Sequence, residues 1–174
     1  MRRSRTVLVL ALTATATGLR LVTRTRLPGI RPENAHAFLA TPANWPAVVL
    51  SSHSVAPVDS VPVDRPLEVG EAVDEIFGLP PVLPLSVRWT CAAADARAGT
   101  LRMVSAEGVG GVATDCAMDF AITPSEGDGC ELELTMTYAP ASPLATLAAP
   151  ILAIDNAVAL RKARAGGIEE RDVA

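Results

Sequence analysis

Aromatic side chains are scarce in this chain: Phe, Trp and Tyr together make up 3% of its 174 residues, although hydrophobic residues make up 49%. A composition this apolar excludes a disordered chain. The length suits one domain with a short appendage and is sufficient to bury a sizeable core. We therefore expect a core built from Val, Leu, Ile and Ala. The 14 Pro and 12 Gly residues favour strands and loops over a helical bundle.

Cysteine and histidine are also few. The three cysteines, Cys91, Cys116 and Cys130, have no C-x-x-C spacing, so they fit neither a disulfide framework nor a zinc site. We expect them to act as small buried hydrophobic residues. The two histidines, His36 and His53, lie on different expected elements with no carboxylate motif beside them, and we expect His36 at the surface or edge of its helix. The chain also lacks G-x-S-x-G, P-loop and dinucleotide-binding motifs. We therefore expect no metal and no cofactor.

Acidic residues are absent before Glu33, whereas seven of the 15 basic residues lie in that stretch. From Glu33 onward the chain has eight basic and nineteen acidic residues, a balance of −11. A body this acidic repels a phosphate backbone, and no basic patch with interleaved aromatic residues is present. The charge pattern therefore excludes nucleic acid as a partner, and it leaves the oligomeric state open.

The acid-free amino terminus has the order of a targeting segment. A basic stretch (1–5) precedes the apolar run TVLVLAL (6–12), and Ala14-Thr15-Ala16 has the A-x-A form of a cleavage site. The same residues fit an organelle transit peptide, and an ordinary disordered or strand-forming terminus is the alternative. The apolar run is too short for a membrane span, so we expect no stable membrane insertion. Residues 1–16 are thus a candidate segment for export or organelle import; without that role the chain would be cytoplasmic.

Alternation of apolar and polar residues predicts a series of strands after this segment. Gly- and Asp-containing turns separate consecutive strands in the second half of the chain. Strands in such hairpin succession make an antiparallel sheet. The predicted strands are Leu19–Arg26, Val48–Val58, Glu68–Phe77, Leu85–Ala94, Thr100–Ser105, Val112–Ile122 and Glu131–Tyr138.

Helices are expected beside this sheet. Pro32, with Glu33 in the first turn, predicts one short helix, and Thr41-Pro42 predicts the start of a second, which carries Trp45. After Pro143 the period changes to 3.6, which predicts a long helix ending near residue 165. Because it is the only long amphipathic element, we expect the sheet to curve around it. Its predicted inward stripe is Leu144, Leu147, Ile151, Ile154 and Val158.

Between two of the predicted strands lies an apolar segment, Gly78–Pro84 (GLPPVLP), with three prolines in seven residues. Proline cannot donate to a sheet ladder, so this segment is not expected to be a central strand. We predict a long loop that covers a cavity.

Several stretches together resemble one known superfamily. They are Arg24–Pro46 (RTRLPGIRPENAHAFLATPANWP), Val69–Glu75 (VGEAVDE), Val87–Ala92 (VRWTCA), the hairpin Asp119–Tyr138 and the helix from Leu144. In order and spacing they resemble the START-like, or SRPBCC, superfamily in its polyketide cyclase/dehydratase and lipid-transport branch. The resemblance covers roughly residues 19–165.

This resemblance implies an α+β helix-grip fold: a curved antiparallel sheet of about seven strands around a long C-terminal helix, with two short helices after the first strand. It also implies a hydrophobic cavity between sheet and helix. Members of the superfamily bind lipids, sterols, polyketides, quinones or hormones, and some are enzymes. We assign residues 17–165 to this domain and residues 166–174 to a loose C-terminal tail.

Candidate cavity residues follow from the inward faces of these elements. Nearly all are apolar, and each would fit a solid core as well as a cavity. His53 is included because, with period 2, it shares a strand face with Ser51 and Val55; the alternative, which the sequence favours, is that it faces solvent. The candidates are Trp45, His53, Phe77, Trp89, Met118, Phe120, Leu134, Met136, Ile151 and Ile154.

Four polar residues are candidates for chemistry in the cavity. Asp74 and Glu75 are adjacent in a predicted strand, so their side chains point to opposite faces and one of them is expected to face inward. Burial there would raise the pKa of the carboxyl and let it act as an acid or base. Thr114 and Tyr138 are the other two candidates.

The sequence favours a protein that binds or carries a small hydrophobic ligand, such as a lipid, polyketide or quinone, and it favours this over an enzyme. The alternative is a cyclase/dehydratase-like enzyme that uses polar cavity residues for acid/base chemistry, and a third is an interaction module with a filled cavity. We expect at most two polar side chains to converge in the cavity. Three mutually hydrogen-bonded groups would favour the enzyme.

Overall fold

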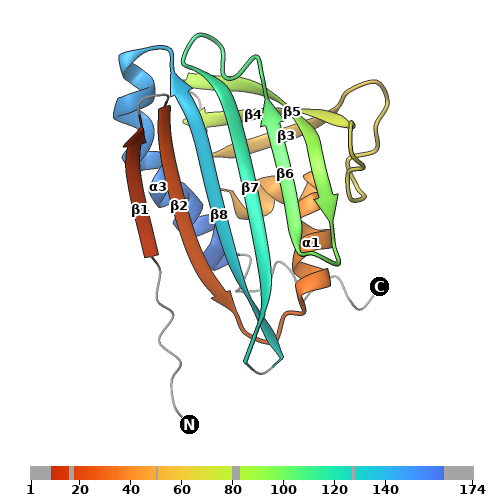
Figure 1. Ribbon diagram of the computed structural model, residues 1–174. Helices are drawn as coiled ribbons and strands as arrows, with labels where there is room; N and C mark the ends of the chain where they lie inside the picture. The colour runs from red at the N-terminus through yellow and green to blue at the C-terminus, as the bar shows by residue number, and fades with distance from the viewer. Residues whose placement is uncertain (1–8, 16–17, 50, 80–82, 127, 163–174) are drawn as a thin grey trace.

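The computed structural model describes residues 9–15, 18–49, 51–79, 83–126 and 128–162, and these form one curved antiparallel sheet with helices on its concave side (Figure 1). The strands of the described residues stand in the order β1-β2-β8-β7-β6-β5-β4-β3. Their bounds are β1 Val9–Thr15, β2 Gly18–Leu27, β3 Ser52–Pro57, β4 Ala72–Leu79, β5 Leu83–Asp95, β6 Thr100–Ser105, β7 Ala113–Ser125 and β8 Gly129–Pro140.

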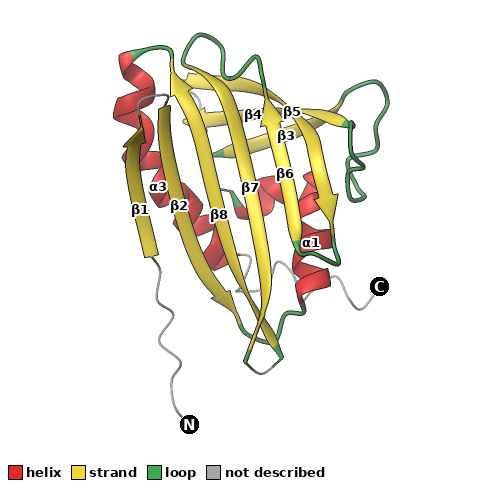
Figure 2. Ribbon diagram, in the orientation of Figure 1, coloured by secondary structure: helices red, strands yellow, loops and turns green. Residues whose placement is uncertain are grey.

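The helices lie behind this sheet in the view of Figure 2. Helix α1 packs against β6 and β7, whereas α3 packs against β1, β2, β8 and α2. Within the described ranges, no helix has the length and apolar character needed to cross a membrane. The helical bounds are α1 Pro32–Ala40, the 3-10 turn η1 Pro42–Asn44, α2 Trp45–Val48 and α3 Pro143–Lys162.

The predicted fold class is confirmed, with one strand more than expected. Val9–Thr15 forms the edge strand β1, which pairs with β2 from Val9 opposite Arg24 to Thr15 opposite Gly18. These residues belong to the candidate targeting segment, so the strand-forming alternative describes them in this structure. A role of residues 1–16 in targeting stays a prediction. The predicted tail, 166–174, lies outside the described residues.

Side-chain hydrogen bonds to the end of α1 fix the turn into α2. Pro32 is the first residue of α1, as predicted, and Phe38 and Leu39 are buried. Asn44 Nδ2 donates to the Phe38 carbonyl at 2.9 Å, and Trp45 Nε1 donates to the Leu39 carbonyl at 2.9 Å. Both bonds go to carbonyls of the last turn of α1, and the Phe38 carbonyl also accepts the Thr41 backbone N–H. They hold the Trp45 ring in a defined position beside the sheet.

The segment predicted as a long covering loop is instead the end of the β4–β5 hairpin. Gly78 pairs with Pro84 and Leu79 pairs with Leu83, while residues 80–82 lie outside the described residues. The end of a hairpin tolerates proline because few ladder hydrogen bonds are needed there. The loop prediction is therefore wrong for the described part of this segment.

Helix α3 turns a different side toward the sheet from the predicted one. Leu144, Leu147 and Ile154 are 44%, 73% and 63% exposed, whereas Ala145 and Asp155 are buried. A small residue such as Ala145 lets the helix lie close to the sheet. A buried carboxylate needs hydrogen-bond partners, and Asp155 has one in the backbone N–H of Ser51, directly before β3. Neither requirement is visible in hydrophobic periodicity, which selects the largest apolar residues.

The expectations for cysteine and histidine have different outcomes. Cys91, Cys116 and Cys130 are free and buried, as predicted. His36, which we expected at the surface or edge of its helix, is buried, and its Nε2 lies 3.1 Å from the carbonyl oxygen of Thr100 on β6. This contact joins α1 to the sheet.

Two glycines in turns have left-handed backbones but different surroundings. Gly99, in the turn between β5 and β6, has φ +67°, and a Cβ there would lie 2.1 Å from the carbonyl oxygen of Ile122 on β7. Gly29, in the turn after β2, has φ +78°, and a Cβ there would have no atom within 4 Å. Both positions favour glycine, but only Gly99 also needs its missing side chain for packing.

We expect Gly29→Ala to lower the free energy of unfolding by about 1 kcal/mol and Gly99→Ala to lower it by about 3 kcal/mol, because the second change adds a backbone clash to the left-handed strain. Urea unfolding followed by circular dichroism measures both. Equal losses would contradict the close approach of the β5–β6 turn to β7.

Candidate functional site

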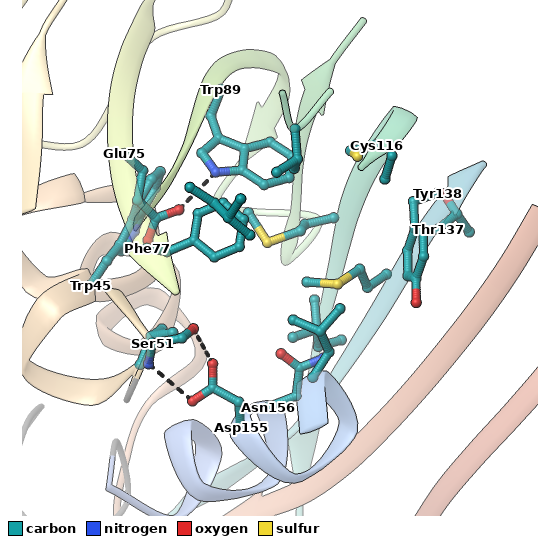
Figure 3. Close-up of a pocket in the computed structure, with 18 of the residues that line it drawn as sticks. Trp45, Ser51, Glu75, Phe77, Trp89, Cys116, Thr137, Tyr138, Asp155 and Asn156 are labelled. Carbon is teal, nitrogen blue, oxygen red and sulfur yellow. Dashed lines mark hydrogen bonds between the residues drawn. The ribbon is translucent and has the colours of Figure 1, made fainter. Parts of the chain in front are cut away.

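A cavity lies between the concave face of the sheet and α3 (Figure 3). Its volume is about 180 Å³. Residues of α1, α2, β4, β5, β7, β8 and α3 line it, so every layer of the fold contributes to its wall.

Strands β7 and β8 provide the apolar side of the cavity, which we call the cavity floor: Met118, Phe120, Leu134 and Met136. Met118 pairs with Met136 and Phe120 with Leu134, so the four side chains lie on one face of the sheet. All four line the cavity, where alternation along the two strands predicts them. Methionine side chains are flexible and polarisable, so this floor can adapt to ligands of different shape.

Three aromatic residues, Trp45, Phe77 and Trp89, line another part of the wall. Figure 3 shows the rings of Phe77 and Trp89 on the side of the cavity where Glu75 lies. Trp45 is held by α1, and Phe77 and Trp89 come from β4 and β5. All three are cavity candidates predicted from the sequence.

Glu75 places a carboxyl group in this wall. It is 8% exposed and accepts a hydrogen bond of 2.8 Å at Oε2 from Trp89 Nε1 (Figure 3). Burial raises the pKa of this carboxyl; the hydrogen bond from Trp89 opposes the change, and the negative charge of Asp155 adds to it. Glu75 therefore keeps its proton to a higher pH than an ordinary glutamate.

Asp74 faces away from the cavity, and its selection as a cavity candidate is corrected here. Arg88 on β5 donates to its two carboxylate oxygens at 2.8 and 2.9 Å, and these bonds lower the pKa of Asp74. Because adjacent residues of a strand point to opposite faces, Glu75 is the inward one of the two.

Helix α3 brings two polar residues to the cavity that the sequence analysis missed. Asp155 accepts a hydrogen bond of 3.3 Å from the Ser51 backbone N–H and another from the Ser51 hydroxyl. Asn156 is 6% exposed, and its Nδ2 has no hydrogen-bond partner among the described residues. Figure 3 shows both side chains directed from α3 toward the cavity. A signal was available: these two residues interrupt an otherwise apolar run, ILAIDNAVAL (151–160).

Tyr138 on β8 lines the cavity, as proposed, and its hydroxyl donates to the Ala145 carbonyl on α3 at 3.3 Å. This bond connects the sheet with the first turn of α3. Thr137, its neighbour, also lines the cavity and was not among the candidates.

Two candidates, His53 and Thr114, lie outside the cavity because of β-bulges. The register of β3 shifts between Ser52 and Ser54, which places His53 in the bulge; its side chain is exposed, with Nε2 3.3 Å from the Gly78 carbonyl. The register of β7 shifts between Thr114 and Ala117, and Thr114 is exposed. A bulge reverses the inside–outside alternation on one side of it, so strict period 2 misplaces these residues.

The α3 candidates are also corrected. Ile154 is exposed and does not line the cavity, because the inward face of α3 carries Ala145, Leu152, Asp155 and Asn156 instead. The side chain of Ile151 lies outside the described residues.

More polar side chains line the cavity than the two we expected. Their hydrogen bonds within the described part of the wall form separate pairs, Ser51 with Asp155 and Trp89 with Glu75, rather than one set of three mutually bonded groups. No group of three or more His, Cys, Asp or Glu side chains is arranged to hold a metal ion in the described ranges. The polar residues of the lining are Ser51, Glu75, Thr137, Tyr138, Asp155 and Asn156.

Comparison of the sequence with family models and with curated proteins finds no match. Comparison of the structure finds solved proteins of similar fold. Ginseng major latex-like protein 151 from Panax ginseng is 12% identical, with a TM-score of 0.63 over 84% of this chain and 95% of its own. A protein from Rhodobacter sphaeroides is 18% identical, with a TM-score of 0.62 over 90% of this chain and 96% of its own. A protein from Chromobacterium violaceum is 15% identical, with a TM-score of 0.61 over 86% of this chain and 99% of its own.

Similarity at such low identity concerns the fold, since one fold can carry many functions. These structures match nearly their whole length to this chain, as the resemblance in the sequence predicts. This chain therefore shares the fold of these proteins, and the helix-grip arrangement of a curved antiparallel sheet around a C-terminal helix is confirmed.

Proposed function

We propose that this protein binds a small hydrophobic ligand, such as a lipid, polyketide or quinone, in the cavity between the sheet and α3, and that it acts as a binding or carrier protein. The observation that carries the proposal is the cavity of about 180 Å³ next to the cavity floor, lined mainly by apolar side chains.

An apolar wall without contacts is costly, because the side chains around a void lose dispersion contacts that a packed core would provide. Helix α3 faces this space with Ala145, Leu152, Asp155 and Asn156, while Leu144, Leu147 and Ile154 are exposed. An apolar ligand would restore the missing contacts and remove its own surface from water.

A cyclase/dehydratase-like enzyme is the second candidate, and Glu75 is the observation that favours it. A buried carboxyl with a raised pKa, in the wall of a cavity, can serve as a general acid or base. We rank the carrier function higher for two reasons. Oε2 of Glu75 already accepts a hydrogen bond from Trp89, and Asp155 is hydrogen-bonded to Ser51 rather than to Glu75. Burial also raises the pKa of Cys116 in the cavity wall to about 11, which disfavours a thiolate nucleophile.

Binding can be tested with N-phenyl-1-naphthylamine, an uncharged apolar fluorophore, which we expect the full chain to bind with enhanced fluorescence. Met136→Trp places a larger side chain in the cavity from its floor and should weaken binding about tenfold or more. A tenfold loss of affinity corresponds to about 1.4 kcal/mol of binding free energy. Leu152→Trp fills the same space from α3 and should do the same. Fluorescence titration measures each affinity.

Thr123→Trp provides the matched control, because Thr123 is exposed on β7 and does not line the cavity. It should leave the affinity unchanged, and circular dichroism should show that all three variants are folded. Folded Met136→Trp and Leu152→Trp proteins that bind the fluorophore as the wild type does would refute binding in this cavity.

The Glu75 carboxyl gives the protein a defined pH dependence. Its pKa is raised in the folded state, so its contribution to stability is complete below the pKa of the unfolded chain, about 4.3, and is lost as pH rises through the folded pKa. We therefore expect the stability of Glu75→Gln, relative to the wild type, to improve as pH rises above the unfolded pKa and to level off once pH passes the folded pKa. Urea unfolding at several pH values measures the difference.

Asp74→Asn is the control for this titration. Hydrogen bonds from Arg88 lower the pKa of Asp74, so its contribution is present above the unfolded pKa of about 3.9 and is lost only as pH falls through the lower folded value. Its difference from the wild type should stay constant between pH 5 and pH 8. A Glu75→Gln difference that is equally constant would contradict the burial of Glu75.

A further inference from the structure

The hydrogen-bond donors of the cavity wall differ in whether protein atoms already use them. Four of them donate to protein oxygens: the indole N–H groups of Trp45 and Trp89 and the hydroxyls of Ser51 and Tyr138. Asn156 differs, because its Nδ2 is buried in the wall without a partner among the described residues.

A buried amide N–H group without a partner has lost its bonds to water and gained nothing in exchange. Buried polar groups in folded proteins are nearly always hydrogen-bonded, so one that faces a cavity indicates an acceptor that the cavity is built to receive. Figure 3 shows the Asn156 amide at the α3 side, directed across the cavity. An acceptor oxygen on a bound molecule would complete its bonding.

The charges around the cavity restrict what that acceptor can be. Among the described residues that line it, Glu75 and Asp155 carry carboxyl groups, and none is Lys, Arg or His. A fatty-acid carboxylate entering this space would lose its hydration, find no positive partner and meet the carboxylate of Asp155. A carbonyl oxygen accepts the hydrogen bond without bringing a charge or a donor of its own.

We propose that Asn156 Nδ2 binds the carbonyl oxygen of an uncharged, otherwise apolar ligand, so that the cavity selects neutral carbonyl compounds over fatty-acid anions. This inference rests on the proposed function and specifies its ligand class. The apolar part of the ligand lies against the cavity floor of Met118, Phe120, Leu134 and Met136, and its oxygen lies at α3.

The test is competition at pH 8 between N-phenyl-1-naphthylamine, which has no carbonyl group, and either 2-undecanone or undecanoate on the full chain. The ketone should bind the wild type at least about tenfold more tightly than the carboxylate does. Asn156→Leu should weaken the ketone about tenfold, the order expected for losing a buried hydrogen bond, and leave the fluorophore within about twofold. Asn156→Asp, of the same shape, removes the donor and should weaken the ketone similarly.

Thr123→Val is the control, because it removes a hydroxyl from the exposed face of β7 at a position that does not line the cavity. It should leave both affinities unchanged. Variants of Asn156 that bind the fluorophore and still bind the ketone as the wild type does would overturn this inference and leave the proposed function standing, as would a wild type that prefers undecanoate. A wild type that does not bind the fluorophore would instead overturn the proposed function itself.

Discussion

Helix α3 approaches the sheet with small and polar residues, and the cavity depends on this contact. Ala145 and the Tyr138 hydroxyl join the start of the helix to β8, and Asp155 is bonded to Ser51 farther along. Held at these two points, the helix closes the concave face without filling it. Had Leu144, Leu147 and Ile154 also faced inward, more apolar side chains would have occupied the concave face. The same arrangement leaves Leu144, Leu147 and Ile154 exposed.

Most polar groups of the cavity wall are also held by hydrogen bonds within the protein. A carboxyl, an indole N–H or a hydroxyl in an apolar cavity is tolerated when it is bonded, and most of those here are bonded to each other or to carbonyl oxygens. These bonds fix the wall in one arrangement and reduce the ordering that binding would require. The combination suits selective binding of an apolar molecule better than it suits proton transfer, because catalysis needs groups that are free to exchange protons with a substrate.

Much of this structure follows from the sequence, and the exceptions have physical causes. Alternation in β7 and β8 correctly places Met118, Phe120, Leu134 and Met136 on one face, because the pleat has a strict period of two. It fails for His53 and Thr114, where a single extra residue in a bulge reverses the pattern and no local signal marks the insertion. Periodicity finds helix α3 but not its orientation, since packing distance and the bonding of Asp155 decide which side faces inward. Asn156, the residue most informative about the ligand, was passed over for the same reason.

The most direct test of the account is NMR of the full chain with ¹³C-labelled methionine methyl groups, titrated with N-phenyl-1-naphthylamine. Met118 and Met136 belong to the cavity floor, whereas Met103 is fully buried on β6 and does not line the cavity, so it is an internal reference. The account predicts ligand-to-methyl nuclear Overhauser contacts at Met118 and Met136 that are stronger than any at Met103, which lies opposite Met118 on β6. A bound fluorophore that contacts neither Met118 nor Met136 would contradict the claim that this cavity is the binding site.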